Sequence, residues 1–162
     1  MKIAIMSDSH DHVKTLLKAM KKAEDLGCEV LVHCGDFCAP FMIQELAKFK
    51  GKVHCCYGNT DDRSSSAVIA KENNVDLQGD TGIIEVDNKT IAFCHFPDVA
   101  EELAQTGKYD LVCHGHTHTK SEKLIRDVRV INPGEIMGYR SKPSFAIYDT
   151  ETDDVAFLYV DE

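Results

Sequence analysis

Short apolar runs alternate with amphipathic segments along the first half of the chain. Residues 2–7 (KIAIMS) are apolar enough to be buried on both faces, which predicts a strand inside a sheet. Apolar side chains then recur at helical spacing over residues 13–26, and Gly27 follows where a helix-ending glycine belongs. The same alternation predicts strands at 29–34 and 52–57, helices at 40–49 and 67–73, and a polar loop at 61–66. The first half is therefore predicted to run βαβαβα.

The second half has a different pattern. Two apolar stretches flank Asp-Asn-Lys at 87–89 and predict a hairpin of residues 82–86 and 90–94. A helix is predicted at 99–106, and further strands are predicted at 109–113, 123–126, 128–131, 144–148 and 155–160. We expect this half to be largely antiparallel, which gives an α/β protein with two sheets and helices outside them. No repeat or linker divides the chain, so residues 1–162 are predicted to form a single domain.

Composition and charge narrow the class of protein. Of the 162 residues, 43% are hydrophobic and 28% charged, values typical of a globular protein and not of a disordered or fibrous one. The formal net charge of −9 repels polyphosphate backbones, so general nucleic-acid binding is not expected. The chain turns polar after six residues and holds no apolar run near the roughly 20 residues of a membrane span, which predicts a cytoplasmic protein with no signal peptide and no membrane partner.

The seven cysteines lie mostly in apolar runs, where a free cysteine packs as a small hydrophobic side chain. Their odd number and the lack of a Cys-x-x-Cys pair argue against a disulfide framework and fit a reducing compartment. Cys34 and Cys38 are candidate thiolate ligands, but the interpretation as non-ligating thiols is favoured.

Side chains that ligate metals follow five of the predicted strands, at the point where each strand ends. These residues are Asp8, His10, Asp36, Asn59, His95, His116 and His118. Open α/β sheets place their sites at the carboxyl ends of their strands, so we expect the seven side chains to share one cleft. Gly35, Gly58 and Gly115 permit tight turns that aim the next side chain into it.

The residue types predict a two-metal centre. Carboxylates, an amide oxygen and imidazoles form a mixed ligand set that suits Mn²⁺, Fe²⁺, Zn²⁺ or Ni²⁺ and is poor for a structural thiolate zinc. Seven ligands are too many for one ion and a reasonable number for two. A carboxylate such as Asp36 can bridge ions about 3.5–4 Å apart, the spacing that clamps the oxygens of an in-line displacement at phosphorus.

Each motif is weak evidence by itself. Asp8-Ser9-His10 is more simply an ordinary loop, Gly58-Asn59 is more simply a turn, and His95 alone could be a core histidine. Gly-His-x-His at 115–118 is more specific, because two imidazoles two residues apart project the same way from extended chain. The occurrence of all five motifs in this order carries the prediction.

As a set, Asp-x-His, Gly-Asp, Gly-Asn-x-Asp, a later His and Gly-His-x-His resemble the calcineurin-like metallophosphoesterase superfamily, above all its small single-domain bacterial and archaeal phosphodiesterase branch. The likeness runs from MSDSHDH through VHCGD to VINPGE at 130–135. It implies a four-layer α/β/β/α sandwich with two mixed β-sheets flanked by helices. It also implies a metal-dependent phosphodiesterase that hydrolyses P–O bonds by a hydroxide bound between two metal ions, with Mn²⁺ expected and Ni²⁺, Fe²⁺ or Zn²⁺ as alternatives.

The resemblance also implies how the ligands divide. One metal would be held by Asp8, His10, Asp36 and His118, and the other by Asp36, Asn59, His95 and His116. Asp36 would bridge the two ions, and Asp36 and Asn59 would belong to the catalytic machinery. Asp61 would fix the loop that carries Asn59.

Two positions depart from the family pattern. Many members read Gly-Asn-His-Asp, where the histidine donates a proton or binds the phosphate, but this chain has Thr60, a poor acid at neutral pH. His12 and His114 lie close enough in sequence to serve as catalytic residues instead, although an exposed loop histidine and a packed strand-end histidine are the simpler interpretations. Phe96-Pro97 stands after His95 where a glycine is common, and we expect it to reshape the cleft wall.

Two other functions compete with phosphodiester hydrolysis. The same superfamily includes a retromer subunit that works as a non-catalytic scaffold, but loss of metal ligands would mark that fate and none is missing here. His114-x-His116-x-His118 suggests a metallo-β-lactamase, yet that pattern would continue with Asp-His where this chain has Thr119-Lys120. We therefore expect an enzyme that acts on a small phosphate ester, and a homodimer is plausible from base rates alone.

Overall fold

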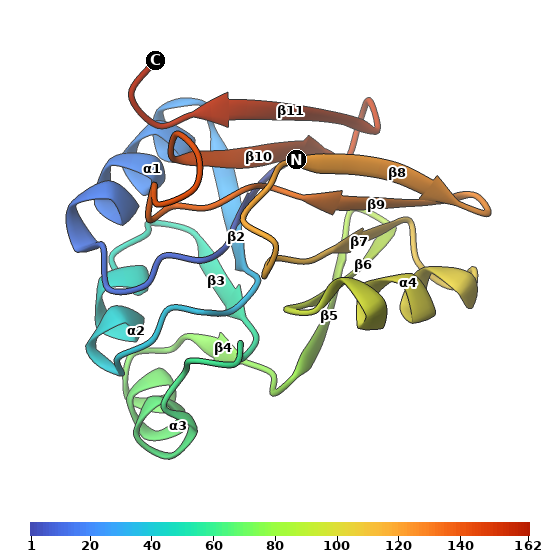
Figure 1. Ribbon diagram of the computed structural model, residues 1–162. Helices are drawn as coiled ribbons and strands as arrows, with labels where there is room; N and C mark the ends of the chain where they lie inside the picture. The colour runs from blue at the N-terminus through green and yellow to red at the C-terminus, as the bar shows by residue number, and fades with distance from the viewer.

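The computed structural model describes residues 1–162 as two β-sheets packed face to face (Figure 1). The first sheet has the strand order β11-β10-β1-β2-β3-β4. Its strands are β1 (Lys2–Met6), β2 (Cys28–His33), β3 (Lys52–Cys55), β4 (Asp76–Leu77), β10 (Ser144–Asp149) and β11 (Asp154–Tyr159). Strands β1 to β4 run parallel, while β10 pairs antiparallel with β1 and β11 pairs antiparallel with β10.

The second sheet has the order β5-β6-β7-β9-β8. Its strands are β5 (Thr81–Val86), β6 (Lys89–Cys94), β7 (Leu111–Cys113), β8 (Ser121–Ile125) and β9 (Val128–Asn132). The three inner strands β6, β7 and β9 pair in parallel, and the edge strands β5 and β8 pair antiparallel to them. Both sheets are therefore mixed.

Helices cover the outer faces of both sheets (Figure 1). The first sheet carries α1 (Val13–Asp25), α2 (Phe41–Leu46) and α3 (Arg63–Glu72), and the second carries α4 (Pro97–Gln105). This arrangement confirms the predicted four-layer α/β/β/α sandwich. Each helix is too short or too polar to cross a lipid bilayer.

Three layers of buried apolar side chains hold the sandwich together. One lies between the first sheet and its helices, one between the two sheets, and one beneath α4. Successive residues of a central strand serve different layers: Met6 packs toward the helices and Ile5 toward the second sheet, and both are fully buried. Burial on both faces explains why β1 is apolar along its whole length.

The pairing within the second half differs from the prediction. The sequence pattern predicts a largely antiparallel arrangement, but β6, β7 and β9 are parallel neighbours. Helix α4 connects β6 to β7 and so builds a βαβ unit. The alternation of apolar residues predicts which segments are strands, but their relative direction depends on which distant partner each one meets.

Helix α3 begins earlier than the pattern predicts. A polar loop is predicted at 61–66 and a helix at 67–73, whereas the helix starts at Arg63. Asp62 caps it, because its side chain accepts a hydrogen bond from the N–H of Ser65 at 2.9 Å. The serine-rich first turn has no apolar periodicity, so only the cap marks its start.

Replacing Asp62 with alanine tests the contribution of this cap. The Asp62→Ala variant loses the acceptor of a first-turn N–H group, so we expect its melting temperature to fall by a few degrees in a circular-dichroism melt. Glu72→Ala removes the same charge from the last turn of the helix and serves as the control, with a melting temperature equal to or slightly above that of the wild type. Identical melting of Asp62→Ala and the wild type would show that the cap does not stabilise the fold.

Candidate metal centre

Five strands bring the predicted ligands to one edge of the sandwich. Strands β1, β2 and β3 of the first sheet and β6 and β7 of the second are followed by Asp8, His10, Asp36, Asn59, His95, His116 and His118. Positive φ angles between 39° and 68° occur at Asp8, His10, Asp36, His116 and His118. Residues other than glycine rarely adopt this backbone conformation, and it clusters at functional sites.

The carboxylate of Asp8 faces two imidazoles. Its Oδ1 lies 3.3 Å from Nε2 of His118 and 3.8 Å from Nε2 of His10. Nε2 of His10 lies in turn 3.4 Å from Oδ2 of Asp36. Oδ1 of Asp8 and Nε2 of His10 are buried and have no hydrogen-bond partner. Buried polar atoms almost always have a hydrogen-bond partner. The lone pairs of these two atoms point into the same space, where a bound cation would be their partner.

A second group of donor atoms surrounds His95. Its Nε2 lies 3.3 Å from Oδ2 of Asp36 and 3.0 Å from Oδ1 of Asn59. Nδ1 of His116 lies 3.2 Å from the same Nε2 and 3.1 Å from Oδ1 of Asn59. A carboxylate, an amide oxygen and two imidazole nitrogens thus point into one space, a set that fits a borderline divalent ion.

Contacts behind two of the imidazoles determine which nitrogen faces the cleft. Nδ1 of His95 donates to the carbonyl oxygen of Cys34 at 2.9 Å, and Nδ1 of His118 donates to Oε2 of Glu135 at 2.6 Å. In both rings Nε2 is left as the nitrogen with a free lone pair. Histidines that bind metals typically donate their second nitrogen in this way. Glu135, a fully buried acid in the loop after β9, was not among the residues predicted from the sequence. The available signal was a carboxylate directly after a buried strand and Pro-Gly.

Asp61 joins the loops that follow β2 and β3. Its Oδ2 accepts hydrogen bonds from the N–H groups of Asp36 (3.0 Å) and Gly58 (2.6 Å), and its Oδ1 accepts one from Cys38 (2.6 Å). These bonds agree with the expectation that Asp61 fixes the loop of Asn59. The two loops approach closely, because a Cβ atom on Gly58 would lie 2.1 Å from Oδ1 of Asp36. Glycine is therefore required at this position.

The charges of the cluster favour a cation. The carboxylate of Asp8 raises the pKa of His10 above its ordinary value, with a further contribution from Asp36. Burial lowers the pKa of His95, but the contact with Asp36 outweighs burial and the net shift is upward. Burial also raises the pKa of Asp36, yet His95 and the N–H of Thr60 outweigh it and hold this pKa well below the usual range. Asp36 is thus ionised and attracts positive charge.

Eight residues line the cleft: His10, Asp36, Asn59, Thr60, His116, Thr117, His118 and Arg140. None of them is hydrophobic. Thr117 and Arg140 were not singled out from the sequence. Arg140 lies in a polar loop whose path back to the cleft has no signature in the sequence.

Neither of the two predicted alternative proton donors lines the cleft. His12 is exposed, and its Nδ1 donates to the carbonyl oxygen of His10 at 2.8 Å. His114 is buried, with Nδ1 3.0 Å from the carbonyl oxygen of Gly115, and burial lowers its pKa. The catalytic roles of both residues stay predictions. The surroundings of His12 are those of an exposed loop histidine, and the surroundings of His114 are those of a packed histidine at a strand end. Cys38, a candidate ligand in the sequence, places its sulfur 3.2 Å from Nδ1 of His10, behind that imidazole.

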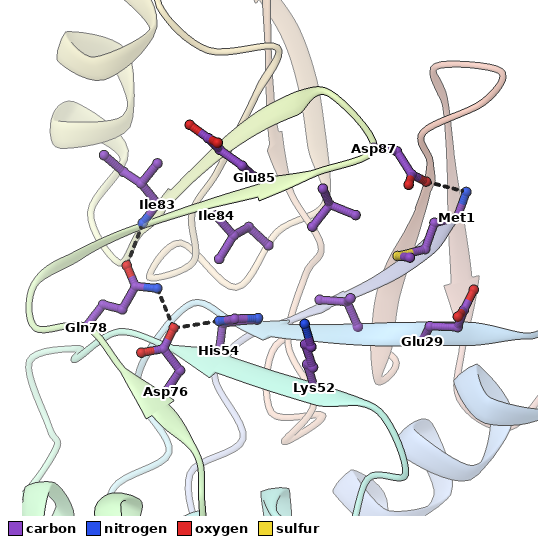
Figure 2. A pocket seen from close by; sticks show the side chains of 12 residues that line it. Met1, Glu29, Lys52, His54, Asp76, Gln78, Ile83, Ile84, Glu85 and Asp87 are labelled. Carbon is purple, nitrogen blue, oxygen red and sulfur yellow. Dashed lines mark hydrogen bonds and ion pairs between the residues drawn. The ribbon is translucent and has the colours of Figure 1, made fainter.

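A larger cavity lies elsewhere, between the edges of the two sheets at β3, β4 and β5 (Figure 2). His54, Asp76 and Gln78 lie at one end of it. Nδ1 of His54 donates to Oδ2 of Asp76 at 2.7 Å, and the amide of Gln78 donates to the same oxygen. None of the predicted site residues lines this cavity, and these polar groups satisfy one another.

Comparisons with known proteins agree on one family. The model of the calcineurin-like phosphoesterase superfamily domain matches residues 1–153. A phosphodiesterase of Methanocaldococcus jannaschii is 38% identical over 159 residues, which cover 93% of this chain and 94% of that protein. A probable metallophosphoesterase of Bacillus subtilis is 24% identical over 164 residues, which cover 100% of this chain and 92% of that protein.

Solved structures give the same picture. The structure of an archaeal phosphodiesterase superposes with a TM-score of 0.91 at 35% identity, covering 98% of this chain and 99% of that chain. Vps29 from Entamoeba histolytica, solved in complex with zinc, superposes with a TM-score of 0.70 at 16% identity, covering 99% of this chain and 100% of that chain. At that identity the second likeness concerns the fold alone.

The three hydrogen bonds accepted by Asp61 can be tested by substitution. Asp61→Ala leaves three backbone N–H groups of the site without acceptors, so we expect the free energy of unfolding to fall by about 3 kcal/mol and the bound metal to decrease. Asp61→Asn keeps one acceptor oxygen, so its free energy of unfolding and its metal content are expected to fall less. Urea denaturation and elemental analysis measure the two effects.

Asp80→Ala provides the control for the loss of one negative charge. Asp80 is exposed and pairs only with the exposed Arg63, so its replacement is expected to change stability little. If Asp61→Ala were no less stable than Asp80→Ala, the bonds from Asp61 would not support the site.

Proposed function

The chain belongs to the calcineurin-like phosphoesterase superfamily, and we propose that it is a phosphodiesterase that works with two divalent metal ions. The observation that carries the proposal is the convergence of seven metal-ligating side chains from five strand ends. Two of their atoms, Oδ1 of Asp8 and Nε2 of His10, are buried without a hydrogen-bond partner. The relationship to an archaeal phosphodiesterase supports the choice of phosphodiesters as the substrate class.

The proposed ligands form two sets that share one carboxylate. The first set is Asp8, His10, Asp36 and His118, and the second is Asp36, Asn59, His95 and His116. The position of Oδ2 of Asp36 supports a bridging role, since it lies 3.4 Å from Nε2 of His10 and 3.3 Å from Nε2 of His95. We expect Mn²⁺, with Ni²⁺, Fe²⁺ or Zn²⁺ as alternatives, because carboxylate, amide and imidazole donors accept all of them.

The chain's own residues prepare this geometry. The N–H of Thr60 holds Oδ1 of Asp36 at 3.0 Å, which leaves Oδ2 to face the imidazoles. The N–H of His116 holds Oδ2 of Asp8 at 3.2 Å and leaves Oδ1 inward in the same way. Two bound divalent ions would lower the pKa of a coordinated water and neutralise charge that develops on the phosphoryl oxygens.

Thr60 favours diesters over monoesters as substrates. Its hydroxyl lies 3.1 Å from the sulfur of Cys38, and neither group is an effective acid at neutral pH. Burial, as the largest effect, raises the pKa of Cys38 to about 11. A leaving group that needs no protonation, such as a nitrophenolate, therefore suits this cleft best.

The non-catalytic scaffold remains the alternative function. The Vps29 chains share the fold at 16% identity, a level that carries no argument about activity. All seven predicted ligands are present: five line one cleft, and the buried Asp8 and His95 contact them, so no observation favours the scaffold over the enzyme.

Hydrolysis of bis(p-nitrophenyl) phosphate tests the proposed activity. We expect metal-stripped protein to be inactive, Mn²⁺ to restore turnover, and Asp36→Asn to lower kcat/KM by more than about 100-fold, because the bridging carboxylate is lost. Asp76→Asn removes the same charge in the distant cavity, where Asp76 contacts only His54 and Gln78, and is expected to retain activity. A folded protein that binds two ions but hydrolyses no diester with any divalent metal would favour the scaffold.

A further inference from the structure

The loop between β9 and β10 returns to the metal cleft and brings Arg140 to its rim. Arg140 lines the cleft together with Asp36, Asn59, His10 and His118. It is the only lysine or arginine among the eight lining residues. The chain as a whole has a formal net charge of −9, and Arg140 supplies the one permanent positive charge among the residues that line the cleft.

The exposed guanidinium of Arg140 makes no ion pair and no hydrogen bond within the protein, although the carboxylate of Asp36 lines the same cleft. Two of the other three arginines are engaged, since Arg63 pairs with Asp80 and Arg129 pairs with Glu122, while Arg126 is also unpaired but lies away from the cleft. All N–H groups of the Arg140 fork thus remain free to bind an anion that enters the cleft.

The backbone of Arg140 is nevertheless fixed. Its N–H donates to Oε1 of Glu135 at 2.5 Å, and the N–H of Ser141 donates to the same oxygen at 2.7 Å. The other carboxylate oxygen, Oε2, accepts the hydrogen bond from Nδ1 of His118. Since Glu135 is fully buried, one rigid carboxylate sets the position of Arg140 relative to a proposed metal ligand.

We propose that Arg140 binds the non-bridging oxygens of the substrate's phosphodiester group. This assignment rests on the proposed function, and it adds a residue that touches substrate without holding a metal. A guanidinium presents two parallel N–H groups that match two oxygens of one phosphoryl group. None of the eight lining residues is hydrophobic, so the phosphodiester group is the part of the substrate that these residues are suited to bind.

Arg140 contacts an anion that is present in both the substrate and the transition state. Its loss is therefore expected to raise KM more than it lowers kcat, because uniform binding is removed. Inorganic phosphate carries the same oxygens, so its affinity for the metal-loaded protein should fall in parallel.

The experiment compares Arg140→Met, Arg140→Lys and Arg126→Met in metal-loaded protein. Isothermal titration measures the affinity for inorganic phosphate, steady-state kinetics with bis(p-nitrophenyl) phosphate measures KM and kcat, and elemental analysis measures metal content. We expect Arg140→Met to weaken phosphate binding and raise KM by about 10- to 100-fold at unchanged metal content. Arg140→Lys keeps the charge but not the fork, and is expected to recover part of the loss.

Arg126→Met is the matched control. Arg126 is exposed in the β8–β9 turn, has no ion pair, and lines a different cavity with Tyr109 and Asp110. The Arg126→Met substitution changes the net charge by the same amount as Arg140→Met, and we expect its phosphate affinity and KM to stay at wild-type values. An equal loss in both variants would mean that long-range charge, and not contact, is responsible, and would overturn the assignment.

The titration separates this assignment from the proposed activity. If the wild type binds phosphate but hydrolyses no diester, weaker binding by Arg140→Met still supports the assignment while the phosphodiesterase proposal fails. Phosphate affinity equal in Arg140→Met and wild type overturns the assignment even if both are active. Absence of phosphate binding by the metal-loaded wild type overturns it as well.

Discussion

The hydrogen bond from Nδ1 of His95 to the carbonyl oxygen of Cys34 is the interaction on which the candidate centre depends. It joins the two sheets at the edge where both deliver ligands, and neither sheet carries the full donor set. The first supplies Asp8, His10, Asp36 and Asn59, and the second supplies the remaining histidines. The apolar layer between the sheets fixes how far apart they lie, but apolar packing has no direction. A directional bond at the edge is what brings Nε2 of His95 to within 3.3 Å of Asp36.

Placing several carboxylates and imidazoles in one small space has an electrostatic cost. The protein meets part of it with backbone N–H groups, which hold the outer oxygens of Asp8 and Asp36. The inner oxygens are left facing imidazole nitrogens, and divalent ions are the natural partners of such a set. Arg140 extends the same principle outward, because it offers positive charge to a substrate oxygen that the metals alone would have to neutralise. Glu135 connects the proposed metal ligands to the proposed substrate-binding residue, since it contacts both His118 and the backbone of Arg140.

Much of this arrangement could be predicted from the sequence, because a strand followed at once by a polar ligand is a local pattern. The convergence of the seven side chains follows from strands ending at one edge, and the order of strands and helices predicts two sheets with helices outside them, while the four-layer sandwich was implied by the resemblance to the family. The parallel pairing of β6, β7 and β9 could not be predicted, since strand direction is decided by distant partners. Strand β4 has only two residues and no periodicity, and the start of α3 is marked by Asp62 alone. Glu135 and Arg140 were missed because their roles exist only once the loop after β9 folds back onto His118.

Strand β1 lies in the interior of the first sheet, between β2 and β10, and its first residue pairs with Asp149. Asp8 accepts a hydrogen bond from His116, 108 residues further along the chain. Contacts across such separations form late in folding, because closing a long loop costs entropy before the contact can repay it. During synthesis, the emerging first half carries Asp8, Asp36 and Asn59 but none of the histidines of the second sheet. The two proposed ligand sets therefore become complete only when the second sheet has formed and packed against the first.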